Sequence, residues 1–313
     1  MGLSLGACAY LMPKNLGYDS RIVSVQTLPL FNQRKLYTDP GAKNWKGNWI
    51  LRRKRLDLID SQFRQIRPDL LILQSLMFKK GSDSENDQSL LDSGALSGYT
   101  WQKADLNEYD DTWEVESMAV ASNAMFQTSA HSEVPWNKLW TMGRKSYLSG
   151  FKVSLEGSPV LIMNIDLKHS IARQERWYRF VSHRIIETQK ETGICPQRTI
   201  LAGHFGGSEG QPDYTDMLRS LSLKDTAHGF CENESACYTD SSENDLYLLT
   251  KGDRRPGRSI RILVHQQTLI YTATRNFDKI TSQFQIASGE TLSALPPSPF
   301  FGWLTTIRLP RCQ

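Results

Sequence analysis

The sequence predicts a single α/β domain whose sheets are mostly mixed or antiparallel. Three observations favour this class. Short apolar segments rich in β-branched residues alternate with polar loops, two longer segments have the spacing of amphipathic helices, and no internal repeat or long linker separates a second domain. The chain has 313 residues, 39 % of them hydrophobic and 22 % charged, so it can bury a sizeable core. No apolar run approaches the roughly 18 residues that a membrane-spanning helix needs.

The first part of the chain predicts a strand, a helix and a second strand. RIVSVQTLPLF, residues 21–31, predicts a strand that ends at Pro29. Apolar residues recur every three to five positions over residues 48–66, which predicts an amphipathic helix with the basic run 52–55 on its solvated face. Pro68 ends that helix, and DLLILQSLM is so continuously apolar that we expect a strand buried on both faces. Residues 79–97, rich in Ser, Asp, Gly and Asn, predict a long loop.

The remaining chain predicts further strands around a second long helix. Strands are expected at SMAVASN, GFKVSL and SPVLIMNIDL. The long helix is expected within residues 170–193, with Gly193 in a C-cap role. RTILAGHF predicts a strand that delivers a polar side chain to the rim of a pocket, and a short helix is expected near residues 213–223. The strands SIRILVH, QTLIYTATR and FFGWLTTIRL complete the domain.

The charge balance restricts the class of partner only weakly. The net charge is +4 and the isoelectric point is near 8.7, which suits an anionic partner. A dedicated DNA-binding protein carries a much denser basic cluster, so nucleic acid is not favoured as a partner.

The cysteines and the amino terminus suggest a location outside the cytoplasm. Cys231 and Cys237 lie six positions apart in a polar loop and predict a local disulfide, with two free thiols as the alternative. LSLGAC, which ends at Cys8, has the Leu-small-small-Cys form of a bacterial lipoprotein processing site. Only seven residues precede Cys8, fewer than a signal peptide needs, so either the start is truncated or the match is due to chance. We therefore expect an N-terminal segment at residues 1–20 that carries a lipid anchor and one domain at residues 21–313, in a periplasmic or membrane-anchored lipoprotein or otherwise a secreted protein.

Six short motifs in a fixed order resemble the endonuclease/exonuclease/phosphatase superfamily. RPDLLILQSLM resembles the family motif DPDVVGLQEV, SMAVASN resembles GVAILSR, and VLIMNIDLKHS resembles VVFNTHLQA. Further along the chain, TILAGHFG resembles ILAGDFN, SIRILVH resembles RIDYIFV, and LSALPPSPFFGWLTTIRL resembles LSDHYPVVATFRL. The likeness runs from Arg21 to Leu309, and residues 237–265 are most similar to the sphingomyelinase-like branch. The resemblance implies a DNase I-like fold, a four-layer α/β sandwich of two packed mixed or antiparallel β-sheets flanked by helices.

The resemblance also implies a chemistry, the attack of water on a phosphodiester beside a divalent cation such as magnesium. In the family, a glutamate after the Leu-Gln strand and an asparagine of the first strand hold the ion. The aspartate and asparagine of GDFN orient the nucleophile and bind phosphate. The histidines of NTHL and SDH transfer protons and stabilise the phosphate.

Most of these groups are replaced by other residue types in this chain, while the surrounding strand and turn residues still match. Only the asparagine of NTHL is retained. In chain order, the matching positions hold Gln26 for the first-strand asparagine, Ser75 for the glutamate, Asn164 and Asp166 for the Asn and His of NTHL, His204 and Gly206 for the Asp and Asn of GDFN, Arg261 for the Asp of RIDYIFV, and Ala294 and Leu295 for the final Asp-His pair.

These replacements predict a catalytically inactive member of the superfamily that retains no metal or other cofactor. Loss of one general acid or base typically lowers a rate by about 10² to 10⁴, and here several groups of one mechanism are replaced together. Such a protein would act by binding a phosphorylated small molecule or lipid headgroup, or a protein partner. Membrane association would come through Cys8.

Three alternatives remain open on the sequence alone. Asp166 and His204 could form a rebuilt site for a divergent metal-dependent phosphodiesterase of the nuclease or sphingomyelinase/phospholipase C type, because an Asp-His pair is a competent base and imidazole favours zinc. Arg261 could bind phosphate together with His204, Asp166 and Asn164, or it could simply pair with an acidic neighbour. Finally, tryptophans near the expected pocket mouth could form a partner or membrane surface or pack in the core. These tryptophans are Trp101, Trp113, Trp136 and Trp140.

Overall fold

The computed structural model describes most of the strands and helices of the chain. The described residues are 17–30, 57–79, 94–109, 114–122, 147–155, 157–167, 175–206, 211–232, 234–239, 257–277, 284–285, 291–292 and 302–312.

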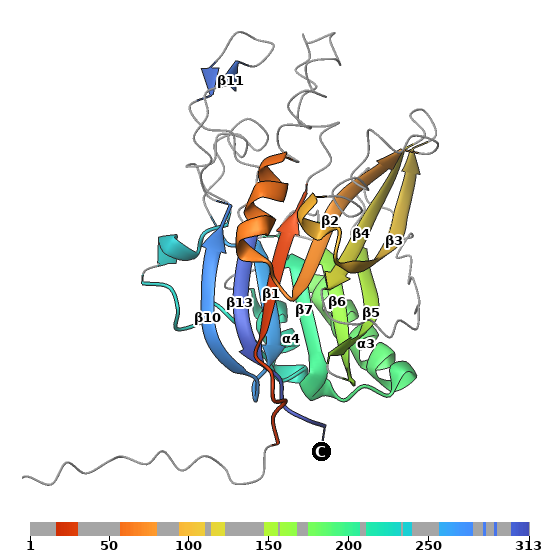
Figure 1. Cartoon of the computed structure of the whole chain (residues 1–313). Helices are drawn as coiled ribbons and strands as arrows, with labels where there is room; N and C mark the ends of the chain where they lie inside the picture. Colours follow the sequence, from red (N-terminus) through yellow and green to blue (C-terminus); the bar gives the residue numbers. More distant parts are fainter. Residues whose placement is uncertain are drawn as a thin grey trace, which may run out of the picture.

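Two main sheets form the centre of the molecule (Figure 1). The six-stranded sheet contains, in spatial order, β10 (Leu269–Asn276), β13 (Gly302–Arg308), β1 (Val23–Pro29), β2 (Leu70–Lys79), β4 (Glu114–Ser122) and β3 (Thr100–Tyr109). The five-stranded sheet contains β5 (Tyr147–Leu155), β6 (Ser158–Asp166), β7 (Thr199–His204), β9 (Ile260–His265) and β8 (Leu223–Asp225). A separate pair is formed by β11 (Phe284–Gln285) and β12 (Thr291–Leu292).

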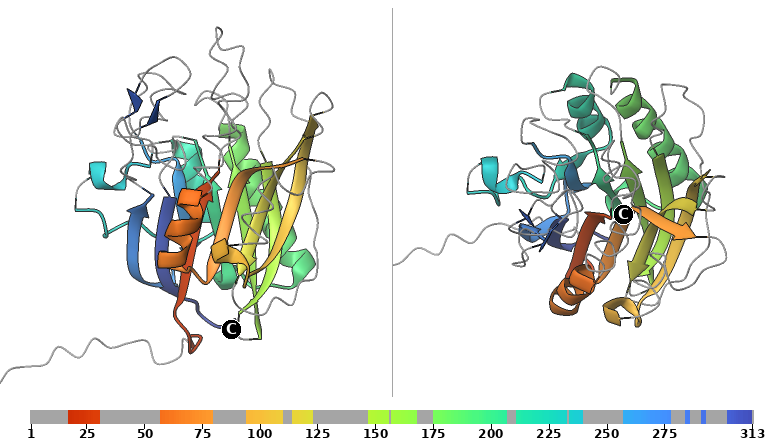
Figure 2. Two further views of the ribbon diagram at one scale, coloured as in Figure 1. Left: turned by 45° about the horizontal axis from the view of Figure 1, so that its top comes forward. Right: turned by 90° about the horizontal axis from the view of Figure 1, so that it is seen from above.

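Helices cover the outer face of each sheet, so the molecule has four layers (Figure 2). A helix whose described part is residues 57–66 and the 3-10 turn η2 (Gly94–Leu96) pack on the six-stranded sheet through Ile59, Phe63 and Leu96. The helices α3 (Glu175–Thr192) and α4 (Pro212–Ser220) pack on the five-stranded sheet. A third apolar cluster, which includes Val25, Ile72 and Ile162, fills the space between the two sheets. The predicted DNase I-like, four-layer α/β sandwich is therefore confirmed.

The strand and helix predictions hold where the structure describes them. Every predicted strand has its counterpart, from β1 to β13, and the second long helix ends at Thr192 with Gly193 at a positive φ of 66°. Residues 48–56 of the first helix and most of the loop at 79–97 lie outside the described residues. The sequence did not predict the strands β3, β8, β11 and β12. Strand β8 has only three residues and β11 and β12 have two each, too few to show a periodicity.

The end of the fold where the chain enters and leaves is held by a buried ion pair and a disulfide. The guanidinium of Arg198, in the 3-10 turn η4 (Pro196–Arg198), donates from Nη1 to Asp19 Oδ2 at 2.9 Å and to the carbonyl of Pro310 at 3.2 Å. Tyr18 forms a β-bridge with Pro310, and a disulfide joins Cys195 to Cys312. The packed fold thus includes Tyr18 and Asp19, which the sequence assigned to the N-terminal segment.

Both disulfides of the described chain indicate folding in an oxidising compartment. Besides Cys195–Cys312, the structure joins Cys231 to Cys237, the pair that the sequence favoured, next to the 3-10 turn η5 (Glu234–Cys237). Stable disulfides are typical of proteins outside the cytoplasm, so the fold suggests an extracytoplasmic location. Among the described residues, no helix has the length and apolar character to cross a membrane. Cys8 lies outside those residues.

Candidate functional site

A buried polar bridge joins the two sheets beneath the candidate site. Asn164 of β6 donates from Nδ2 to the carbonyl of Leu73 in β2 at 2.9 Å and to that of Ala119 in β4 at 3.3 Å. Its Oδ1 accepts from Gln74 Nε2 at 2.7 Å, and Gln74 also exchanges hydrogen bonds with Thr27. Asn164, Gln74 and Thr27 are all fully buried. Because the amide of Asn164 is already used between the sheets, its described contacts are structural.

Directly after this bridge, Ser75, Asp166 and His204 converge from three strands. Ser75 Oγ donates to Asp166 Oδ2 at 2.9 Å, across the space between β2 and β6. Asp166 and His204 are register partners at the ends of the parallel strands β6 and β7, and His204 Nδ1 lies 3.4 Å from Asp166 Oδ1. The side chain of Asp166 is 3 % exposed and that of His204 is 12 % exposed. Asp166 therefore lies between the hydroxyl and the imidazole, with one carboxylate oxygen facing each.

The order of these three groups determines what they can do. In a hydrolase triad, the serine is next to the histidine, which takes its proton. Here the serine donates to the carboxylate, which is not the order of a hydrolase triad. When His204 is protonated, its imidazolium forms an ion pair with Asp166. The N–H groups of an imidazolium are charge-assisted donors suited to a phosphate oxygen.

The backbone at this site is unusual in both sheets. Ser75 has a φ of 56°, next to a register irregularity in the β2–β4 pairing between Leu73 and Leu76. Left-handed conformations are rare for residues other than glycine and gather at functional sites. In β7, Gly203 has a φ of 134°, and a Cβ there would lie 2.0 Å from the carbonyl oxygen of Ile165. Only glycine allows β6 and β7 to approach this closely just before Asp166 and His204.

Gln26 does not reach this group of residues. Side chains alternate along a strand, so Val25 and Thr27 face the space between the sheets while Gln26 faces the outer side with Leu28. The amide of Gln26 exchanges hydrogen bonds with that of Asn276 at 2.5 and 3.1 Å. The residue of β1 that faces the polar bridge is Thr27.

Arg261 also lies on a different face of its sheet from the candidate site. Its neighbours Ile260 and Ile262 face the core between the sheets, and Arg261 faces α4. Its Nη1 donates to Asp225 Oδ2 at 3.0 Å and its Nη2 to the carbonyl of Arg258 at 2.8 Å. Of the two roles considered for Arg261, the structure places it in an ion pair with an acidic neighbour, which is Asp225 and not Asp166.

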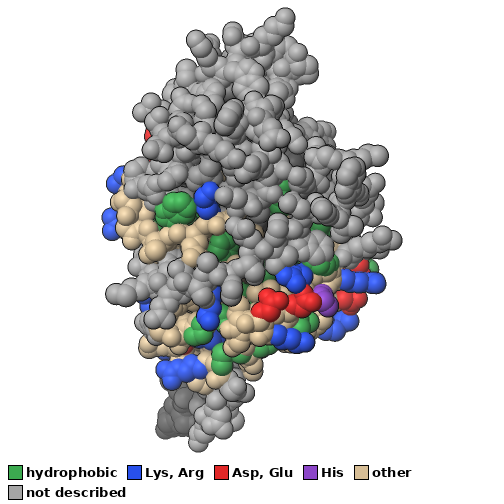
Figure 3. Space-filling view, turned by 90° about the vertical axis from the view of Figure 1, so that its right-hand side faces the viewer, with side chains coloured by type: hydrophobic (Ala, Val, Ile, Leu, Met, Phe, Trp, Pro, Cys, Tyr) green, Lys and Arg blue, Asp and Glu red, His purple; other side chains and the backbone are tan. Residues whose placement is uncertain are grey.

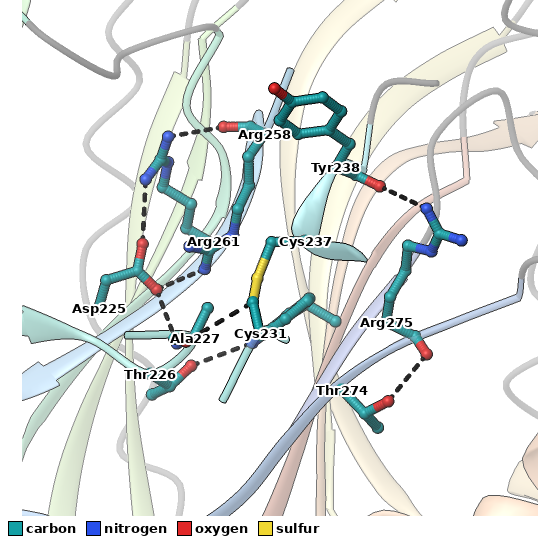
Figure 4. The surroundings of a disulfide bond; sticks show 11 residues. Asp225, Thr226, Ala227, Cys231, Cys237, Tyr238, Arg258, Arg261, Thr274 and Arg275 are labelled. Atoms are coloured by element: carbon teal, nitrogen blue, oxygen red, sulfur yellow. Dashed lines mark hydrogen bonds and ion pairs between the residues drawn. A yellow bond between two sulfur atoms is a disulfide. The ribbon is translucent and has the colours of Figure 1, made fainter. Parts of the chain in front are cut away.

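Asp225 is the centre of a buried charged cluster beside the Cys231–Cys237 disulfide (Figure 4). Arg258 forms a second ion pair with it, and both arginines are nine-tenths or more buried. Burial alone would raise the pKa of Asp225, but the charges of Arg258 and Arg261 and their hydrogen bonds lower it below its ordinary value of 3.8. Burial raises the pKa of Tyr214, whose hydroxyl accepts from Arg261 at 3.4 Å. These groups pair with one another, as in a structural network.

The structure thus brings together four of the predicted positions and separates two. The space between the sheets contains Ser75, Asn164, Asp166 and His204. Gln26 and Arg261 face away from that space. Gly206 follows β7 at a φ of 61°, and Ala294 and Leu295 lie outside the described residues. Trp101 packs against the core beneath the helix at residues 57–66, whereas Trp113, Trp136 and Trp140 are outside the described part. Sequence reasoning missed Gln74 and Thr27, although Gln74 belongs to the Leu-Gln motif that it had aligned.

The described residues do not fit the magnesium ion that the family resemblance implies. Magnesium requires several hard oxygen ligands, and Asp166 is the one carboxylate among the converging side chains. Its two oxygens face Ser75 and His204. Within the described part of the chain, no three His, Cys, Asp or Glu side chains are grouped as metal ligands.

Comparison with known proteins supports the fold, and it does so through solved structures alone. No protein-family model and no curated protein sequence matches the chain. Among solved structures, an endonuclease/exonuclease/phosphatase family protein from Bacteroides thetaiotaomicron aligns with a TM-score of 0.65 and 16 % identity, over 92 % of this chain and 98 % of that one. The mannosyl-6-phosphatase Bt3783 from the same organism aligns at 0.62 and 15 %, over 91 % and 99 %. A truncated TDP2 from Caenorhabditis elegans aligns at 0.61 and 16 %, over 91 % and 97 %.

Proposed function

We propose that this chain, which has the fold of the endonuclease/exonuclease/phosphatase proteins, is a non-hydrolytic member that binds a phosphorylated small molecule or lipid headgroup beside His204. The observation that carries the proposal is the position of Ser75, whose hydroxyl donates to Asp166 at 2.9 Å where the resemblance implies a metal-binding glutamate. A neutral hydroxyl is a weaker ligand for a hard cation than the carboxylate that the resemblance implies at this position. What remains is an acid–imidazole pair, which suits anion binding.

The chemistry of His204 defines the class of ligand. Its imidazolium would be paired with Asp166 on one side and would donate to an anionic oxygen on the other. A dianionic phosphate attracts such a donor more strongly than a neutral sugar hydroxyl does. One of the structural neighbours is named as a mannosyl-6-phosphatase, which supports a phosphorylated ligand for this scaffold.

Binding and hydrolysis can be measured separately. We expect inorganic phosphate, phosphocholine or a sugar 6-phosphate to bind in calorimetry, and binding to be lost in His204→Ala. We expect no hydrolysis of bis(p-nitrophenyl) phosphate above background with magnesium, manganese or zinc. His183→Ala is a matched control, because His183 is 70 % exposed on α3. Metal-dependent turnover that disappears in Asp166→Asn would contradict the proposal.

A second candidate function is favoured by the 3.4 Å contact between Asp166 and His204. This pair could serve a divergent phosphodiesterase that uses zinc, because imidazole and carboxylate are both zinc ligands. Additional ligands would then have to come from outside the described residues. A zinc-dependent rise in melting temperature that is absent in His204→Ala would support this candidate, and no shift with zinc, manganese or magnesium would end it.

The proposed location is outside the cytoplasm, at a membrane to which Cys8 is attached through lipid. The Leu-small-small-Cys motif before Cys8 and the two disulfides support this proposal. Metabolic labelling with a radioactive fatty acid in a bacterial host tests it. Incorporation that is lost in Cys8→Ala is the expected result, and no incorporation in the unchanged chain would contradict it.

A further inference from the structure

Basic side chains surround the place where the chain enters and leaves the fold. Arg311 packs on Gly17, and its backbone N–H donates to the carbonyl of Gly17 at 2.7 Å. Arg308 donates to the carbonyls of Asp19 and Ser20. Arg21 and Arg67 follow alongside, since Arg21 pairs with Asp69, two residues after Arg67. We call Arg21, Arg67, Arg308 and Arg311 the entry arginines.

The acidic side chains at this end do not cancel the entry arginines. Asp69 balances Arg21, and Asp19 is used by the buried Arg198. The positive charges of Arg67, Arg308 and Arg311 are therefore in excess over the described acidic side chains at this end of the fold. The exposed Lys190 and Glu191 at the end of α3 offset each other. The face of the molecule in Figure 3 differs, because acidic and basic side chains lie interspersed on its described part.

Two exposed apolar side chains lie among these arginines. Ile22, 47 % exposed, directly precedes β1, whose first residue Val23 pairs with Ile307 next to Arg308. Tyr271, 43 % exposed, lies in β10 at the register irregularity opposite Ile307 and Thr306. They are two of the four large hydrophobic side chains of the described chain that are exposed. Basic residues with an aliphatic and an aromatic side chain between them are typical of a surface that contacts lipid headgroups.

We propose that this end of the molecule, formed by the entry arginines with Ile22 and Tyr271, is a surface that binds an anionic lipid bilayer. The occupant is inferred from charge and from chain length. Cys8 lies nine residues before Gly17, so a lipid on Cys8 could be at most about 30 Å from the fold. A chain tethered at that distance brings its nearest surface to the bilayer, where the arginines meet anionic headgroups within a Debye length of about 10 Å.

The orientation has a consequence for the candidate site. Strand β6 begins beside Arg198, which donates to the carbonyls of Ser158 and Pro159, and it ends at Asp166. Nine extended residues span about 26 Å, at roughly 3.3 Å per residue step. The Asp166–His204 contact is thus at the end of the fold that faces away from the bilayer, and its ligand approaches from the aqueous side. The surface proposal does not depend on what that ligand is.

Cosedimentation of the unacylated chain with lipid vesicles tests the surface. Vesicles of phosphatidylglycerol and phosphatidylcholine at a ratio of 3:7 are compared with pure phosphatidylcholine at low and physiological salt. We expect binding to the anionic vesicles that weakens with salt. The variant Arg67→Gln/Arg311→Gln should bind about 25-fold more weakly, since each basic residue near such a surface contributes about fivefold.

A matched variant separates this surface from net charge. Lys103→Gln/Arg179→Gln also removes two charges, from an exposed position in β3 and from the opposite end of the fold in α3, where Arg179 is 82 % exposed. Its binding should remain within about twofold of the unchanged chain. Ile22→Ser should weaken binding to anionic vesicles with no change in its salt dependence. No binding of the unchanged chain to anionic vesicles, or equal losses in the two double variants, would overturn the proposal.

Discussion

Asp166 and His204 are register partners at the ends of β6 and β7, and Oδ1 of the first lies 3.4 Å from Nδ1 of the second. The residues of the two positions are exchanged relative to the family motifs, in which the histidine is on the first of these strands and the aspartate on the second. In this chain the exchange leaves a carboxylate and an imidazole in contact at these two strand ends. The second oxygen of the carboxylate accepts a hydrogen bond from Ser75.

Asp166→Asn should weaken phosphate binding about tenfold at neutral pH. Two effects oppose each other, because the charge of Asp166 repels an anion but also pairs with the imidazolium form of His204. The second effect should prevail, since an anion bound at the far ring nitrogen is more distant from Asp166 than the imidazolium is. A lost charge-assisted contact of about 1.5 kcal/mol corresponds to about tenfold. Calorimetry with inorganic phosphate measures this, and tighter binding in the variant would show that repulsion prevails.

Replacing Ser75 separates its hydrogen bond from its backbone strain. Ser75→Ala removes a hydrogen bond to a buried carboxylate and should lower the free energy of unfolding by about 2 kcal/mol. Ser75→Gly loses the same bond but relieves the φ of 56°, which recovers roughly 1 kcal/mol. Denaturant unfolding of both variants gives the difference. If glycine were the more destabilising of the two, Ser75 would not be strained.

Asn164→Ala should destabilise the fold more than any exposed substitution, by about 3 kcal/mol. It leaves the carbonyls of Leu73 and Ala119 and one donor of Gln74 without this partner inside the protein. Thr27→Val is a graded control, because its hydrogen bonds to Gln74 are longer, at 3.2 and 3.4 Å, and it should cost about 1 kcal/mol. Equal losses in urea unfolding would contradict a bridge centred on Asn164.

The sequence predicts the strands well and the faces of their side chains less well. Apolar patterning and the Gly-rich turn after β7 locate Asp166 and His204, because both are at strand ends where a short motif fixes their position. Gln26 and Arg261 face away from the space between the sheets, where the neighbouring residue of each strand faces into it. A shift of one residue moves a side chain to the opposite face, and a nearly continuous apolar strand carries no alternation that would reveal the shift.

The disulfide between Cys195 and Cys312 shows a similar limit of prediction from the sequence. Cys231 and Cys237 are close in sequence, so their pairing is readable, whereas Cys195 and Cys312 are 117 residues apart and meet only because η4 and the end of β13 lie at the same end of the fold. Connectivity between distant cysteines depends on topology that spacing alone does not contain.

The two disulfides should contribute unequally to stability. Closing a loop of 117 residues removes chain entropy worth about 5 kcal/mol, and closing one of six residues about 2 kcal/mol, in the loop-entropy model. Cys195→Ser/Cys312→Ser should therefore lower the free energy of unfolding more than Cys231→Ser/Cys237→Ser. Guanidinium unfolding of the two variants measures the difference. Each variant retains the other disulfide, so the two variants are controls for each other. A larger loss in Cys231→Ser/Cys237→Ser would show that this disulfide stabilises the fold by more than the entropy of closing its loop.

Asp225 should make the fold acid-sensitive. Its pKa is lowered in the folded state, despite burial that raises it, by Arg258 and Arg261. Its stabilising contribution is thus fully present above its ordinary pKa of 3.8 and is lost as the pH falls from there through the lower folded value. Asp225→Asn should cost about 3 kcal/mol at pH 7, because two buried arginines lose their carboxylate, and should flatten the loss of stability below pH 4.

Asp216 provides the matched comparison for this last variant. It also pairs with an arginine, Arg219 at 3.0 Å, but the two side chains are 64 % and 77 % exposed. Asp216→Asn should change the free energy of unfolding by less than about 0.5 kcal/mol, since exposed pairs contribute little. Urea unfolding at pH 7, 5 and 3 compares the two variants. An acid profile in Asp225→Asn identical to that of the unchanged chain would assign the acid sensitivity to other carboxylates.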